Sequence, residues 1–176
     1  MRFAQANEYL LSASLDRTHR LWNTRTGACI RTVTEAAEVL CCHFHPANNN
    51  FYAVGTSKGE VKAYNMSTGK AVSAAGSLSI SGGATAMAFD TLGHLLFIAS
   101  DRGEVHVVTF AASTGRLQRI MRAVVSASPI TGLSHSAWSM QSNAAPLLAV
   151  ASKDGAIRLL KYEMLVLNCC CSCVRV

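Results

Sequence analysis

Two groups of residues have side chains whose types and spacing could do chemistry. The segment GTSKG, residues 55–59, fits the G-x-S-x-G pattern in which a hydrolase presents a nucleophilic serine, here Ser57. That serine must lie between a strand and a helix, whereas Ser57 falls in a predicted turn between two strands. Cys41, His43 and His45 would share one face of a strand and are potential zinc ligands, but no second cluster supplies the remaining ligands. We therefore predict no enzyme, no metal site and no cofactor, and structural roles for these residues.

The C-terminal residues 166–176 hold four of the seven cysteines. Cys170 and Cys173 form half of a zinc pattern, and Cys173 is fourth from the end, as in a prenylation motif. Arg175 stands where that motif wants an aliphatic residue, and clustered cysteines could also accept palmitate. We expect a disordered tail without a role. An odd number of partly adjacent cysteines is a poor disulfide framework, which favours the cytosol or the nucleus.

Composition narrows the classes of partner. The chain has 176 residues, of which 50% are hydrophobic and 15% charged, so it is long enough and apolar enough for a folded core. No apolar run reaches the roughly 18 residues of a membrane helix, and no signal peptide opens the chain. The net charge is +6, but lysines and arginines are scattered and aromatic residues sparse. Nucleic acid is thus an unlikely partner, and neither a membrane nor a small-molecule substrate is expected.

The elements that must position all these residues are repeats. Four segments share an apolar run, a run of small residues, a polar turn and an alternating strand. The equivalent turn positions are Asp16, Lys58, Arg102 and Asp154, which are 42, 44 and 52 residues apart. Gly59, Gly103 and Gly155 would supply a positive φ in this turn. A Thr-Gly turn follows in the first three units, at residues 26–27, 68–69 and 114–115. Four antiparallel strands in about 40–45 residues are typical of a β-propeller blade.

The segment SASLDRTHRLW, residues 12–22, resembles the end of a WD-type repeat, in which Ser, Asp and Trp form a hydrogen-bonded cluster. The resemblance implies that Asp16 holds the turn and that Trp22 packs between sheets and donates its indole N–H. The repeats are degenerate: the family's Gly-His dipeptide is missing, and EAAE, residues 35–38, stands at the first place for it. Residues 37–70 and 86–105 resemble WD-repeat proteins linked to transcriptional control in the nucleus. That resemblance implies transcriptional regulators as partners.

The predicted fold is all-β, a WD40-like β-propeller with about four four-stranded blades in an incomplete ring. The expected units are residues 1–35 with a truncated first strand, 36–80, 81–125, an incomplete unit 126–165, and the tail 166–176. Because WD propellers resemble closed rings of about seven blades, we expect this chain to be a fragment of a longer protein. Glu60 and Glu104, at equivalent hairpin positions, are predicted to be strand-edge residues that aid solubility.

The predicted function is a non-catalytic scaffold that presents loops and blade edges to other proteins. The resemblance implies a nuclear location, and without it a cytoplasmic one is expected. An alternative is a nucleic-acid or phosphate-binding module that uses the basic residues in or beside the equivalent turns, Arg17, Lys58, Arg102 and Lys153. These four residues are the candidate partner-binding residues, whereas Asp16, Trp22 and the three turn glycines are candidate structural residues.

Overall fold

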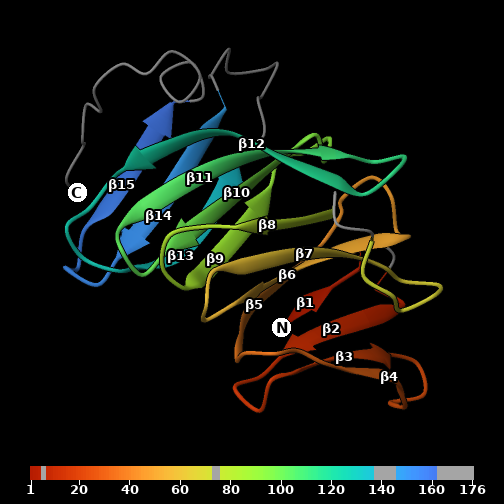
Figure 1. Cartoon of the computed structure of the whole chain (residues 1–176). Coiled ribbons are helices and arrows are strands. Elements are labelled where there is room, and N and C mark those ends of the chain that lie inside the picture. The colour runs from red at the N-terminus through yellow and green to blue at the C-terminus, as the bar shows by residue number, and fades with distance from the viewer. Residues whose placement is uncertain (5–6, 73–75, 137–145, 162–176) are drawn as a thin grey trace.

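The computed structural model describes residues 1–4, 7–72, 76–136 and 146–161, and these ranges contain β-strands and turns but no α-helix. In that part of the chain, accordingly, no helix is available to cross a membrane. The strands form four separate antiparallel sheets, which we call blades 1 to 4 in chain order (Figure 1). The all-β prediction is confirmed, with four strands in each of blades 1–3 and three in the described residues of blade 4.

Within each blade, every strand pairs with the next one in sequence, so each blade is a simple up-and-down sheet. Blade 1 contains β1 (Arg2–Phe3), β2 (Tyr9–Ala13), β3 (Thr18–Asn23) and β4 (Cys29–Thr34). Blade 2 contains β5 (Val39–Phe44), β6 (Phe51–Thr56), β7 (Glu60–Asn65) and β8 (Ser77–Ser79). Blade 3 contains β9 (Ala84–Phe89), β10 (Leu95–Ser100), β11 (Glu104–Ala111) and β12 (Arg116–Val124). Blade 4 contains β13 (Ile130–Ser136), β14 (Leu147–Ser152) and β15 (Ile157–Lys161).

The hydrophobic core lies between the blades. One cluster joins blades 1 and 2, a second joins blades 2 and 3, and a third joins blades 3 and 4. All six residues of β6 and of β10 are buried because another blade covers each face of these sheets. In β14, by contrast, buried and half-buried residues alternate. No cluster among the described residues joins blade 4 back to blade 1, so the four sheets form an arc (Figure 1).

The turn between the second and third strands has the same backbone conformation in every blade. Gly59, Gly103 and Gly155 have φ of 77°, 75° and 79°. Arg17 occupies the equivalent place in blade 1 with φ of 67°, a conformation that costs a residue with a Cβ some free energy. The carbonyl of this residue accepts an N–H from the link to the next blade in blades 1 to 3; for Gly103 the donor is Val125, at 2.9 Å. The turn therefore closes its own hairpin and also anchors the chain that leaves the blade.

Candidate functional site

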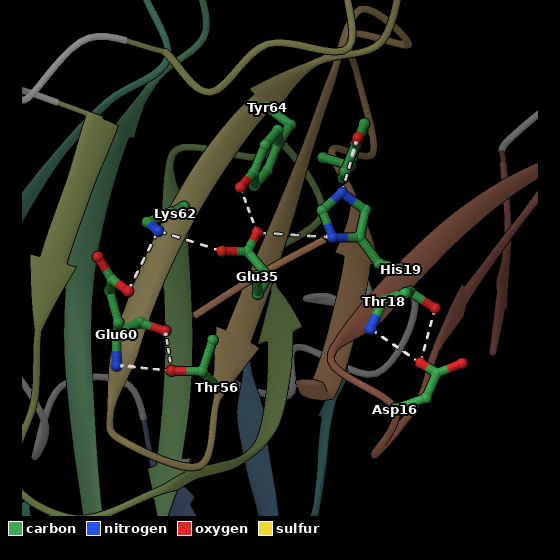
Figure 2. A network of polar contacts seen from close by, with 9 residues as sticks. Asp16, Thr18, His19, Glu35, Thr56, Glu60, Lys62 and Tyr64 are labelled. Atoms are coloured by element: carbon green, nitrogen blue, oxygen red, sulfur yellow. Dashed lines mark hydrogen bonds and ion pairs between the residues drawn. The ribbon is translucent and has the colours of Figure 1, made fainter. Parts of the chain in front are cut away.

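Blades 1 and 2 are joined by a buried network of polar side chains (Figure 2). Its centre is Glu35, on the link between β4 and β5, whose side chain is only 2% exposed. The Glu35 carboxylate accepts a hydrogen bond from Lys62 Nζ at 3.1 Å and another from the Tyr64 hydroxyl. His19 Nδ1 lies 3.6 Å from the same carboxylate, and Lys62 also pairs with Glu60 at 3.1 Å. A single carboxylate thus connects β3 of blade 1 with β7 of blade 2.

Three groups in this network, His19, Tyr64 and Lys62, have shifted pKa values. Burial lowers the pKa of His19 to about 4, although the charge of Glu35 opposes this shift. Burial also raises the pKa of Tyr64, and its hydrogen bond to Glu35 raises it further. Burial would lower the pKa of Lys62, but Glu35 and Glu60 outweigh burial and hold it above its ordinary value. None of these three groups is tuned towards neutral pH as a general acid or base would be, so the network is suited to structure.

A comparable polar contact lies between blades 2 and 3. Ser81, on the link between them, donates a hydrogen bond to Glu104 in β11. Glu104 also pairs with Arg122 at 2.6 Å and lies 3.2 Å from His106. Since Glu104 is only 5% exposed, the prediction that it is a surface residue at a strand edge is wrong. Its charge is retained because Ser81 and Arg122 satisfy it, and together they keep the pKa of Glu104 low although burial alone would raise it.

The junction between blades 3 and 4 follows the same plan. The Ser126 hydroxyl donates to Asp154 at 3.3 Å, and Asp154 pairs with Arg158 at 2.8 Å. Hydrogen bonds from Arg158 and Ser152 hold the pKa of Asp154 well below its ordinary value. Lys62, His106 and Arg158 each lie three residues after the turn glycine, on the third strand of their blade. The sequence analysis missed this set, although a basic residue recurring at one position of each repeat was a readable signal.

In blade 1, Asp16 and Trp22 both make local contacts. Asp16 accepts the Thr18 backbone N–H at 2.8 Å and also binds the Thr18 hydroxyl, which closes the turn between β2 and β3. Trp22 donates its indole N–H to the Ser12 hydroxyl at 3.0 Å. Residues alternate across a strand, so the half-buried Trp22 shares the β3 face opposite to the buried Leu21, which packs in the cluster with blade 2. Trp22 therefore lies on the face away from blade 2, rather than between two of the described sheets.

The candidate partner-binding residues are exposed, on hairpins that lie along one side of the molecule (Figure 1); these residues are Arg17, Lys58, Arg102 and Lys153. Three of the four hairpins also contain an aspartate next to the basic residue, namely Asp16, Asp101 and Asp154. The row of basic residues is therefore interleaved with acidic ones, which weakens any attraction for a polyanion.

The other sequence candidates are engaged in structural contacts. Ser57 lies in the turn between β6 and β7, as expected, and its backbone N–H donates to Glu38 at 2.8 Å. Cys41 donates its thiol to the Ala84 carbonyl at 3.1 Å, and His43 and His45 bind backbone carbonyls. Within the described ranges, no group of three His, Cys, Asp or Glu residues is placed to hold a metal ion. The cysteines of residues 166–176 lie outside the described residues.

A pocket of about 490 Å³ lies at one end of the inner strands β1, β5, β9 and β13. Strand ends of all four blades line it, with Arg2, His43, Asp90 and His135 among the polar residues and Phe89 among the apolar ones. Burial lowers the pKa of His43 and of His135, which favours the neutral form of both imidazoles. The pocket therefore combines hydrogen-bond donors, acceptors and apolar surface, a combination that suits a polypeptide segment.

An arc of four antiparallel blades around inner strands defines a WD40-like β-propeller fold. No family model matches the chain. Over 71 residues the chain is 32% identical to the WD repeat-containing protein 89 homolog of Dictyostelium discoideum. This aligned segment covers 40% of this chain and 19% of that protein. Over 72 residues it is 32% identical to pre-mRNA-processing factor 17 of Homo sapiens and of Mus musculus. This aligned segment covers 40% of this chain and 12% of each of those proteins. The similarity supports the WD-repeat family, and the chain spans less than a fifth of these relatives' length.

Proposed function

We propose that the chain is a non-catalytic protein-interaction scaffold whose binding site is the pocket at the end of the inner strands. The observation that carries the proposal is that four blades contribute to one pocket, since β1, β5, β9 and β13 all line it. The blades are fixed to one another by hydrophobic clusters and by polar junctions such as Glu35–Lys62. A rigid binding surface lowers the ordering cost of association, so a partner would bind without reorganising the blades.

The test is quantitative affinity purification from cell extract with two pocket variants, Arg2→Glu and Ser134→Glu. The control is Lys70→Glu, an equally simple charge change at an exposed residue outside the pocket lining. We expect one set of proteins to be depleted at least tenfold with both pocket variants and retained with the control. Recovery of the same proteins with the wild type, both pocket variants and the control would overturn the pocket as the binding site.

We further propose a nuclear location and partners that regulate transcription. The residues that support this are the paired Cys41 and Cys42, the run Asn48–Asn50 and the segment FDTLGHLL, residues 89–96, which resemble those of WD repeat-containing protein thirteen. Pre-mRNA-processing factor 17 carries a nuclear process in its name, which supports the location but points to a different process. Fractionation of cells that express the tagged chain tests the location. Recovery in the cytoplasmic fraction alone would contradict it.

A second candidate function is binding of nucleic acid or of a phosphorylated partner through the basic turn residues. It is supported by their exposure on four successive hairpins and by the net charge of +6. Such binding must weaken steeply with salt because it releases counterions. The double variant Lys58→Glu, Arg102→Glu should then lose affinity for a labelled oligonucleotide and for a phosphopeptide. Unchanged affinity for both ligands would remove this candidate.

A further inference from the structure

The outer edge of blade 3 differs from the outer edges of blades 1 and 2. Its strand β12 is nine residues long, compared with six for β4 and three for β8. β12 pairs with β11 from Glu104↔Val124 to Ala111↔Arg116, and no described strand pairs with its other side (Figure 1). Such an edge presents backbone N–H and C=O groups that can pair with another extended chain.

The side chains of β12 are basic and partly apolar. The strand contains three arginines, Arg116, Arg119 and Arg122, and no acidic residue. Ile120 and Val124, on the same strand, are 56% and 66% exposed. Any chain that paired with this edge would therefore meet both positive charge and apolar surface.

The register of β12 brings two of the arginines to one face. The strand has a bulge between the partners of Val107 and Val108, so Arg119 lies opposite Val108 and Arg122 opposite His106. Residues two apart on β11 share a face, hence their partners Arg119 and Arg122 share it too. Arg122 already pairs with Glu104 at 2.6 Å. Arg116 and Arg119 have no carboxylate within ion-pair distance among the described residues, which leaves their charge available to a partner.

The positive charge of β12 indicates which kind of chain can pair with this edge. A second copy of β12 pairing with the first would bring arginines towards arginines, which disfavours self-association. A nucleic-acid strand would use stacking aromatic side chains, and β12 has none. We propose that the free edge of β12 binds an extended acidic segment of a partner protein by strand addition, with a partner carboxylate on Arg119. The proposal rests on the scaffold function but assigns a surface separate from the pocket.

A synthetic peptide tests this proposal directly. The probe is a fluorescein-labelled, N-acetylated peptide of sequence ETEVETEVE, and fluorescence anisotropy measures its binding to the full chain. We expect saturable binding that weakens at least tenfold with Arg119→Glu. Arg25→Glu, which changes an exposed arginine in blade 1, should leave the affinity unchanged. Circular dichroism of each variant checks that the blades are intact.

Two further peptides separate strand addition from simple charge attraction. A version N-methylated at alternate residues keeps its charge but cannot donate along one edge, so it should bind at least tenfold more weakly. A version with Lys in place of Glu should not bind. Equal binding of the N-methylated peptide, an unchanged affinity with Arg119→Glu, or tighter binding of a single-stranded oligonucleotide would each overturn the proposal. Ser134→Glu should bind the acidic peptide normally; if pocket variants lose cellular partners while the peptide never binds, this proposal alone fails.

Discussion

The carboxylate of Glu35 lies 3.1 Å from Lys62 Nζ, so the link that leaves blade 1 is paired with the third strand of blade 2. The remaining contacts of this carboxylate are also internal, to Tyr64 and towards His19. Each junction between neighbouring blades has a counterpart of this pair. The stability of the arc should accordingly depend on a few buried polar side chains as well as on apolar packing.

Replacing Glu35 with Gln should destabilise the chain by about 2 kcal/mol, because a hydrogen bond between charged partners in a buried site contributes about that much. The variant keeps the shape of the side chain and removes its charge, which leaves Lys62 with Glu60 alone. Urea unfolding followed by circular dichroism measures the change. Glu8→Gln, which removes the charge of an exposed carboxylate, is the matched control. An equal midpoint for Glu35→Gln and the wild type would contradict the structural role of the network.

The stability should fall on mild acidification, in part because of His19. Its pKa is about 4 in the folded chain and near 6.5 when exposed, so the unfolded chain binds the proton more readily between these values. The contribution of His19 to the free energy of unfolding is therefore complete above about pH 6.5 and is lost as the pH falls to about 4. The loss is at most about 1.4 kcal/mol per pH unit. Unfolding of His19→Gln over this range should show a shallower slope. A slope remains from His43, His45, His106 and His135, whose pKa values are also lowered.

Gly103→Ala and Gly155→Ala form a matched pair, since both residues have φ near 77° and differ in their surroundings. An added Cβ at Gly103 would overlap the backbone carbonyl of Ser126, whereas one at Gly155 would meet no described atom within 4 Å. Gly155→Ala should cost about 1 kcal/mol for the left-handed conformation. Gly103→Ala should cost several times as much because the link between blades 3 and 4 must move. Equal melting temperatures for the two variants would contradict this account.

Arg17→Gly should stabilise blade 1 by up to about 1 kcal/mol, because it relieves the strain of φ 67° at a residue that has a Cβ. The gain is limited by the extra freedom that glycine has in the unfolded chain. Thermal unfolding measures the effect, and Lys58→Gly is the control, since Lys58 is exposed in a turn and has no positive φ. A lower melting temperature for Arg17→Gly would show that its side chain contributes more than its conformation costs.

Local signals in the sequence predicted much of this fold. The alternating runs, the turn glycines and the Thr-Gly pairs each report on neighbouring residues, and they correctly gave four hairpin-rich antiparallel units. The buried roles of Glu35 and Glu104 could not be predicted in this way. Their partners, such as Lys62 for Glu35, are 27 residues away, and only the packing of one blade on the next brings them together. The same holds for the position of Trp22. The sequence indicated the strand that contains this residue, but not which face of the strand packs against another blade.

The alignment of basic turn residues on one side was likewise readable from the repeat spacing. The charge of the surface around them was not predicted. The aspartates beside three of them offset the positive charge of the whole row, and this became evident only once the hairpins were seen to lie along one side. The edge strand β12 shows the opposite case. Its arginines were visible in the sequence, but its length and the lack of a described strand on its other side became clear only from the sheet.

The burial of β6 and β10 on both faces has a thermodynamic consequence. An array in which each unit contacts only its neighbours behaves as a one-dimensional nearest-neighbour system, in which end units fray before inner ones. Amide hydrogens of β6 and β10 should then exchange most slowly with solvent, and those of β2 and β14 faster. Cooperativity in such an array resides in the junctions, so a weakened Ser81–Glu104 contact should split one unfolding transition into two.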